Sequence, residues 1–240
     1  MAVRWCWMAM GVAAAATVSA GASAGAGVPA ALPFAQPTFG PASGPATLER
    51  QVLAELNRLR ADPAGYANAL RHYRRFYHAR LVTVPGAAED YETEEGVAPV
   101  DEAIAWLGGQ APATPYATSA VLGEAARDHG DEQAADGEIG HMGRDGSDPG
   151  ERVSRRGGGR YVAEVITYGS LTAADVVRQL VVDDGVPDRG HRRILFAPDF
   201  RFAGVACAPH PVYRLTCVVD LARTPDGQSR WPLVRYASVN

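Results

Sequence analysis

Two histidines stand out by their position, because each directly follows a glycine near the end of a predicted element. They are His141, in Gly140-His141-Met142-Gly143, and His191, about fifty residues later in Gly190-His191-Arg192. Imidazole acts as an acid, a base or a metal ligand near neutral pH, and a preceding glycine lets the backbone approach a neighbour closely. Two imidazoles with nearby carboxylates and open water positions suit zinc or another divalent cation. The sequence therefore offers a hypothesis of a metal-binding cleft.

Two acids are the candidate partners of these histidines. Glu164 lies inside an apolar stretch, and a buried carboxylate needs a charged or hydrogen-bonding partner. It is therefore either a functional acid or an anchor for a loop. Asp183 follows a helical apolar stripe and points toward the same inward face. Asp184 is shifted by one position and can instead bind Arg189 or Arg192, so either aspartate can be the second cleft acid.

The other histidines are interpreted as structural or surface groups. His72 and His78 are placed on an arginine-rich helix at the surface. His129 shares a helical face with apolar residues and is predicted to be a core or boundary histidine. His210 sits between two prolines and is predicted to be structural.

Several catalytic signatures are absent from the sequence, and so is a strong basic patch. There is no His-Glu-x-x-His, Gly-x-Ser-x-Gly, P-loop or Cys-x-x-Cys motif, which disfavours a nucleophilic-serine enzyme. The net charge is −4, and all 23 basic residues are arginine. A short cluster at Arg71, Arg74 and Arg75 is predicted to be a solvated helix face. Nucleic-acid binding is therefore not indicated.

The N-terminal segment has the composition of an export signal. Arg4 precedes an apolar run from Met8 to Val18, and small residues follow. Residues 1–24 are predicted to be a signal peptide, with an uncleaved membrane anchor as the alternative. Residues 25–45 are rich in Gly, Pro, Ala and Ser and are predicted to be a flexible linker. The protein is thus expected to be secreted or periplasmic, with one domain over residues 46–240.

Cleavage of the predicted signal peptide would remove Cys6. The two cysteines that remain, Cys207 and Cys217, lie on either side of a predicted hairpin turn. An even pair in an exported protein predicts a disulfide, and two buried free thiols are the alternative. The predicted order of elements is helices, a strand, a helix and a hairpin. Residues 81–98, which carry a cluster of acids, are predicted to form a solvated surface loop. This pattern indicates an α+β domain with helices packed on a small antiparallel sheet.

The chain resembles the CAP superfamily of secreted proteins, which comprises cysteine-rich secretory proteins, antigen 5 and pathogenesis-related proteins and is also called the SCP-like extracellular domain. The resemblance covers roughly residues 48–222 and includes patterns typical of bacterial members. The matching segments are Leu56-Asn57-Arg58-Leu59-Arg60; His141 with Asp145-Gly146-Ser147 and Arg152; Ala163-Glu164-Val165-Ile166; and Gly190-His191-Arg192 with Ile194-Leu195.

The resemblance implies a three-layer α-β-α sandwich with a small antiparallel sheet and a tetrad of two histidines and two acids in a central cleft. By motif, the histidines are His141 and His191, and one acid is Glu164. Asp183 takes the position of the second acid. Two departures from the family pattern put the loop hydrogen bonding around the tetrad in doubt. Val165 stands where the family has an asparagine after the glutamate. The segment after His191 also lacks the asparagine that the family has there.

The family's known properties imply three functions that stay open. The first is a secreted binding protein, rather than an enzyme, whose cleft holds zinc or another divalent cation and which binds a lipid or sterol-like apolar ligand. The second is a metal-assisted, peptidase-like hydrolase with Glu164 as the catalytic base. The third is a cell-surface protein that binds a cell-envelope partner without a small ligand. Ligand, native metal and oligomeric state are left open, because a fold alone does not dictate a function.

Overall fold

The computed structural model describes residues 45–85 and 90–229. The predicted signal peptide and nearly all of the predicted linker therefore lie outside the described residues. None of the helices in the described part is long and apolar enough to cross a membrane. The helices are α1 (Pro45–Ala61), α2 (Pro63–Tyr73), a 3-10 turn (Arg74–Phe76), α3 (Ala98–Gly108), α4 (Ala120–Asp136), α5 (Pro149–Arg155), α6 (Ala173–Val182) and α7 (Gly190–Phe196).

The strands form two sheets. Three two-residue strands make a small antiparallel sheet in the order β1-β2-β3, and the main sheet has the order β4-β6-β7-β5. Strands β5, β7 and β6 are antiparallel, whereas β4 pairs parallel to β6 over two residues. The strands are β1 (Tyr77–His78), β2 (Leu81–Val82), β3 (Tyr91–Glu92), β4 (Ala117–Thr118), β5 (Val162–Tyr168), β6 (Phe202–His210) and β7 (Arg214–Ala222).

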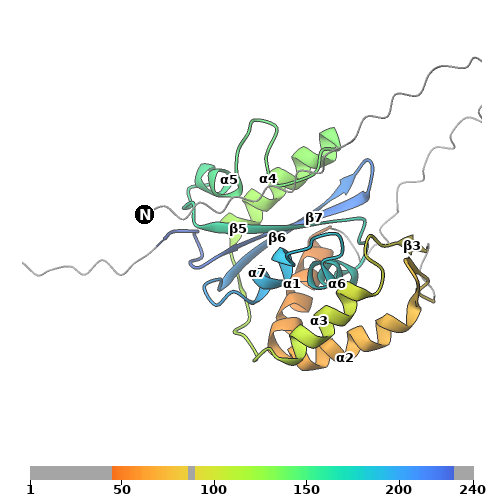
Figure 1. Ribbon diagram of the computed structural model, residues 1–240. Helices are drawn as coiled ribbons and strands as arrows, with labels where there is room; N and C mark the ends of the chain where they lie inside the picture. The colour runs from red at the N-terminus through yellow and green to blue at the C-terminus, as the bar shows by residue number, and fades with distance from the viewer. Residues whose placement is uncertain (1–44, 86–89, 230–240) are drawn as a thin grey trace, which may run out of the picture. The chain divides into compact units, whose positions relative to one another are not determined.

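The main sheet is the middle layer of an α-β-α sandwich. Helices α4 and α5 cover one face, while α1, α6 and α7 cover the other, with α2 and α3 packed outside them (Figure 1). This confirms the predicted fold class, and the short parallel strand β4 is the one addition to the antiparallel sheet.

Local sequence signals account for several element ends. Asp62 caps the start of α2 by accepting a hydrogen bond from the backbone of Gly65, with proline at the first helical position. Thr172 caps the start of α6 by accepting a hydrogen bond from the backbone N–H of Asp175. Gly137 ends α4 with φ of 75°, a left-handed conformation that glycine adopts without steric cost.

The larger hydrophobic core lies between the sheet and the α1–α6–α7 layer. Its fully buried members include Leu56, Leu59, Leu180 and Leu221. Alternate strand residues point to the opposite face, where α4 and α5 cover two smaller apolar clusters. One contains Leu122, Ala125, Val153 and Ala222, and the other contains Ala126, Ile166, Ala206 and Val218.

A row of three residues separates these two small clusters. Glu164 of β5 is the register partner of Asp220 of β7, which is in turn the partner of Gly204 of β6. Both carboxyl side chains are buried. A Cβ atom on Gly204 would lie 2.0 Å from the backbone nitrogen of Gly123 in α4, so only glycine permits this close helix-to-sheet approach.

The acid-rich segment is solvated as predicted, with Glu92 and Glu94 exposed, but it is not entirely a loop. It contains β2 and β3, and His78 lies on β1 rather than on a helix. Asp184 accepts hydrogen bonds from the backbone N–H groups of Glu94 and Glu95 at 2.7 and 2.9 Å. Its predicted pairing with Arg189 or Arg192 is therefore wrong, and Arg189 binds the Glu95 carboxylate instead, at 2.6 Å.

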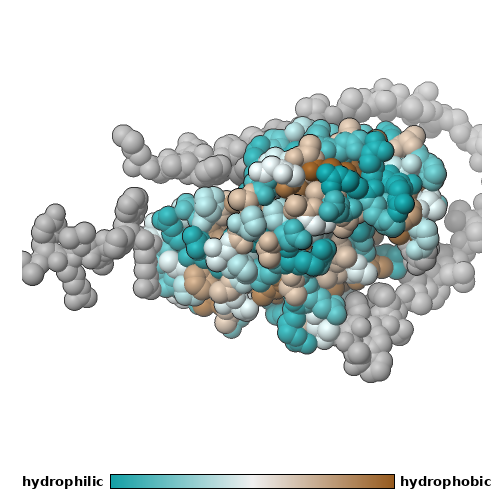
Figure 2. Space-filling model, turned by 90° about the horizontal axis from the view of Figure 1, so that it is seen from below, coloured by the Kyte–Doolittle hydropathy of each residue, from teal (hydrophilic) through white to brown (hydrophobic). Residues whose placement is uncertain are grey.

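The surface seen from below in Figure 2, which carries α2 and α3, mixes hydrophilic and hydrophobic residues. The arginine cluster that was predicted to be a solvated face lies at the end of α2 and in the 3-10 turn after it, at Arg71, Arg74 and Arg75. Arg74 of this cluster pairs with Asp101 of α3 at 2.5 Å, so part of its charge is neutralised locally.

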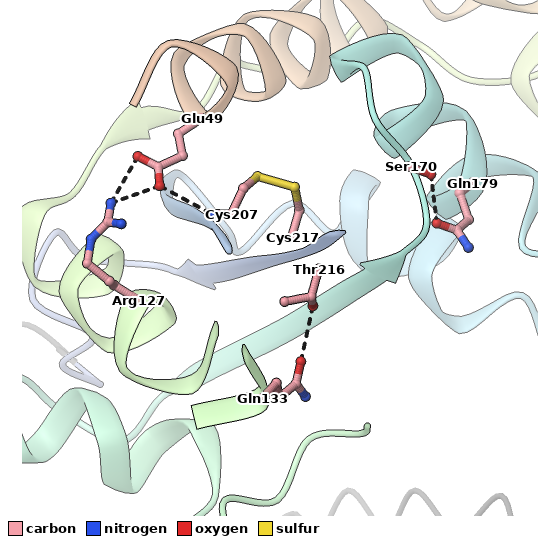
Figure 3. Close-up of a disulfide and its surroundings, with 8 residues drawn as sticks. All are labelled: Glu49, Arg127, Gln133, Ser170, Gln179, Cys207, Thr216 and Cys217. Carbon is pink, nitrogen blue, oxygen red and sulfur yellow. Dashed lines mark hydrogen bonds and ion pairs between the residues drawn. A yellow bond between two sulfur atoms is a disulfide. The ribbon is translucent and has the colours of Figure 1, made fainter. Parts of the chain in front are cut away.

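The predicted disulfide is confirmed. Cys207 and Cys217 are direct register partners on β6 and β7, and their sulfur atoms are bonded. Figure 3 shows that the Glu49 carboxylate of α1 lies beside this bridge, where it accepts hydrogen bonds from the backbone N–H of Cys207 and from Arg127 of α4. Glu49 thereby links the two helical layers around the edge of β6.

We expect reduction of the disulfide to lower the free energy of unfolding by about 3 kcal/mol, because a loop of about ten residues is then no longer closed in the unfolded chain. Urea unfolding with and without reductant measures this effect. The Cys207→Ala/Cys217→Ala variant is the control, since reductant should leave its unfolding unchanged. Equal stability of oxidised and reduced wild type would contradict the prediction.

Candidate functional site

The first half of the site is a buried ion pair that holds His141. Glu164 projects from β5 toward the α4–α5 layer, and its side chain is 1% exposed. Its Oε1 accepts a hydrogen bond from His141 Nδ1 at 2.9 Å, and its Oε2 accepts one from Arg152 of α5 at 2.6 Å. Arg152 also donates to the carbonyl oxygens of His141 and Ser147. A single arginine therefore fixes both the backbone and the partner of His141.

The loop before His141 is held by a second set of contacts. Gly140 has φ of 106°, and its N–H donates to the hydroxyl of Tyr168 at 2.8 Å. Its carbonyl oxygen accepts from His129 Nε2 at 2.8 Å and from Gln133 at 2.9 Å. His129 is buried in α4 and acts as a structural anchor, in agreement with the prediction of a core histidine.

The second half of the site forms where α6 ends and α7 begins. Asp183 follows α6 in a left-handed conformation, with φ of 61°. Its Oδ1 accepts from His191 Nδ1 at 2.6 Å, and its Oδ2 accepts from the backbone N–H of His191 at 2.9 Å. Asp183 is thus the acid of this pair, whereas Asp184 is directed to another loop.

The two histidine–acid pairs meet at the edge of the sheet. Strand β5 is an edge strand, with Glu164 on its α4 side and the α6–α7 turn on the other side. The ring centroids of His141 and His191 lie 6.4 Å apart. The imidazoles are 42% and 22% exposed, whereas both acids are 1% exposed. The structure therefore brings together all four predicted residues, which we call the tetrad.

The charge state of Glu164 follows from three opposing effects. Burial raises the pKa of Glu164, but the hydrogen bond from His141 and the positive charge of Arg152 outweigh burial, so the pKa lies below its usual value. An ionised carboxylate only accepts hydrogen bonds, so Nδ1 of His141 carries the proton. The Nε2 atom of this ring is left for another partner. The ring of His191 is placed in the same way, with Nδ1 toward Asp183 and Nε2 left over.

The metal hypothesis can be tested against this donor set. Within residues 45–85 and 90–229, no group of three or more His, Cys, Asp or Glu side chains is arranged to hold a metal ion. The acids already bind Nδ1 atoms or an arginine, so they orient the rings rather than face a cation. Carboxylates commonly orient metal-binding histidines in this way. The residues do not fit a closed structural zinc site, which needs four protein ligands, and the two imidazoles are the side chains of the tetrad whose Nε2 atoms are not used by the acids.

Asp220 is a buried acid next to the tetrad that the sequence reasoning missed. It is completely buried, and both of its carboxyl oxygens lack a hydrogen-bond partner among the described residues. The available signal was an aspartate inside the apolar run of the last predicted strand. Arg152 was noted only as a motif match, and its ionic role also appears first in the structure.

Comparison with known proteins identifies the family. The model described as "CAP: Cysteine-rich secretory protein family" matches residues 53–220, well over half of the chain. This chain belongs to the CAP family. Comparison with curated proteins found no match.

Two solved structures are similar to this CAP chain. One is an extracellular protein containing a SCP domain from Bacillus anthracis, with 18% identity and a TM-score of 0.38 over 47% of this chain and 35% of that one. The other is an outer surface protein from Borrelia burgdorferi, with 15% identity and a TM-score of 0.38 over 45% of this chain and 77% of that one. The present chain thus matches about a third of the length of the Bacillus anthracis chain.

The two departures from the CAP pattern leave both histidine–acid pairs intact. Val165 lies on the face of β5 opposite Glu164 and is fully buried in the larger core. Arg193, which follows the second histidine motif, pairs with Asp188 at the surface. The asparagines expected at these places are therefore not needed to form the pairs.

We expect Arg152→Met to lower the free energy of unfolding by about 3–5 kcal/mol, because it leaves Glu164 buried without its cation. Arg155→Met is the matched control on the same helix. Arg155 is exposed and pairs with the exposed Asp145, so little change is expected there. Urea unfolding of both variants measures the difference, and equal effects would contradict the buried ion pair.

Proposed function

We propose that this CAP-domain protein is exported and acts as a binding protein that holds a divalent cation between His141 and His191. The observation that carries this proposal is that both Nδ1 atoms are bound to buried acids while both Nε2 atoms remain free of hydrogen bonds within the described residues. Export is supported by the composition of residues 1–24 and by the family itself.

The cation would be loosely held, because the chain offers two imidazole ligands and leaves the other positions to water or to an incoming ligand. Zinc accepts imidazole nitrogen readily and tolerates such open positions. A bound cation would supply a positive centre for an anionic or carbonyl oxygen of a ligand. Asp183 and the Glu164–Arg152 pair contribute by keeping the two rings in one orientation.

Calorimetric titration with zinc chloride, after removal of metal by EDTA, tests the cation proposal. His191→Ala should abolish zinc binding because it removes one of two ligands. Asp183→Asn should weaken binding by about 10–100-fold, because it removes an orienting carboxylate while keeping a residue that tolerates the left-handed conformation.

His78→Ala is the matched control, because His78 is an exposed histidine on β1 outside the tetrad. It should bind zinc as wild type does. Zinc binding that survives unchanged in His191→Ala, or that falls equally in His78→Ala, would refute the assignment to the tetrad.

A second candidate function, binding of an apolar ligand, is favoured by the loop that carries His141. Ile139 and Met142 on this loop are 56% and 59% exposed. They line a surface cavity of about 360 Å³ together with His129 and polar residues of α4. Large exposed apolar side chains grouped beside a cavity mark ligand-binding surfaces. A lipid would place its chain against Ile139 and Met142 and its headgroup against the charged part of the lining, which includes Glu132 and Arg144.

Sedimentation with phosphatidylcholine vesicles in EDTA tests lipid binding. Ile139→Asp/Met142→Asp should lose most vesicle binding, because each aspartate removes apolar contact and adds a charge. Leu81→Asp is the matched control, since Leu81 is an exposed apolar residue on β2. Vesicle binding that is absent in wild type, or equal in all three proteins, would refute this candidate.

The hydrolase alternative gains no support from the position of Glu164. Both of its oxygens are occupied, by His141 and Arg152, and its side chain is almost fully buried. A general base must reach the proton that it abstracts. In this geometry an imidazole Nε2 is better placed for proton transfer than Glu164.

A further inference from the structure

The carboxyl group of Asp220 has a position that needs an explanation. It is 0% exposed in β7, two residues before the end of the strand, and neither oxygen has a hydrogen-bond partner within the described residues. A buried carboxylate without a hydrogen-bond partner is strongly destabilising. Its cross-strand neighbour on the same face is Glu164, and side chains of directly opposed residues lie within contact distance.

Two ionised carboxylates cannot hydrogen bond to each other, because neither has a donor. One shared proton removes both problems at once, since it gives Asp220 a partner and removes a negative charge from the core. The surrounding charges indicate which acid keeps the proton. Arg152 and His141 both donate to Glu164, whereas neither donates to Asp220.

We infer that Asp220 is a protonated positioning residue that donates a hydrogen bond to Glu164 and thereby holds His141 in its orientation. This role concerns the chain itself and does not depend on whether the tetrad binds a cation. In this arrangement the buried group contains one carboxylate, one neutral carboxyl and one arginine, so its charges balance.

The groups around Asp220 act on its proton in opposite directions, and the buried Nε–H of Arg152 has no hydrogen-bond partner within the described residues. Glu164 faces it from β5, Arg152 approaches from α5, and His129 lies on α4, while β6 opposes it with Gly204, which has no side chain. Burial is the largest influence and raises the pKa of Asp220 well above its usual value, and the negative charge of Glu164 raises it further; Arg152 opposes both.

The first test follows stability against pH in zinc-free full chains. Wild-type Asp220 binds a proton when folded and releases it when unfolded, so unfolding becomes easier as pH rises. Asp220→Asn lacks this proton. The ratio of the wild-type to the variant unfolding constant should therefore rise about tenfold per pH unit above pH ~4, until the folded wild type ionises. A ratio that is constant with pH would overturn the inference.

Glu95→Gln is the matched control of opposite sign. The side-chain hydrogen bond from Arg189 lowers the pKa of Glu95 to about 2. Folding is therefore favoured by ionisation of Glu95, and the ratio of wild-type to variant unfolding constants should fall as pH rises through about 2–4.5. If Asp220→Asn instead gives this sign, the inference is overturned.

The second test reads the orientation of His141 by ¹⁵N NMR of histidine-labelled, zinc-free protein, with the signal assigned by its loss in His141→Gln. Asp220→Asn should preserve the Nδ1–H signal, because its amide donates to Glu164. Asp220→Ala should shift it, because Glu164 loses a donor. Val218→Ala removes packing from the same face of β7 and should leave the signal in place. A signal unmoved in Asp220→Ala would overturn the inference.

These measurements separate the inference from the proposed function. A wild-type protein that does not bind zinc would refute the cation site. The pH dependence of unfolding and the His141 Nδ1–H signal would still test Asp220. A pH-independent ratio would refute the shared proton and leave the zinc titration unaffected.

Discussion

The ion pair between Glu164 and Arg152 is the interaction on which the site depends. A buried carboxylate is stable only when its charge is paired and its oxygens accept hydrogen bonds. Here one oxygen takes the guanidinium and the other takes the imidazole of His141. The same guanidinium holds the carbonyl oxygen of His141. The position of the first histidine is therefore a consequence of satisfying one buried charge.

The main sheet is closed in different ways along β6, beyond the short strand β4, and along the edge strand β5. At the β6 edge, Glu49 of α1 binds Arg127 of α4 and the backbone of Cys207, which joins the helical layers directly. At the β5 edge, each layer contributes a histidine with its own acid. The two rings approach each other without a hydrogen bond between them. The first edge is a structural link, and the second presents two partly exposed imidazole rings.

The sequence predicted the fold class from local patterns, whereas the tetrad was predicted through the resemblance to CAP motifs, and the choice between Asp183 and Asp184 stayed open until the structure was known. Helix caps such as Asp62 and Thr172, the cysteine pair and the two Gly-His motifs can all be found without coordinates. Arg152, Asp220 and the true partners of Asp184 could not be assigned in this way. Their roles depend on cross-strand register and on contacts between distant segments, which periodicity does not encode.

The polar row of Glu164, Asp220 and Gly204 also divides the apolar contacts beneath α4 and α5. That layer rests on two small clusters, whereas α1, α6 and α7 share one large continuous core. Cooperative units with fewer buried apolar contacts open at lower free energy. Local unfolding of the α4–α5 layer would break these two clusters without opening the large core. Release of this layer would carry His141 away while His191 stayed anchored, so that assembly of the tetrad reports whether the two halves of the domain are docked.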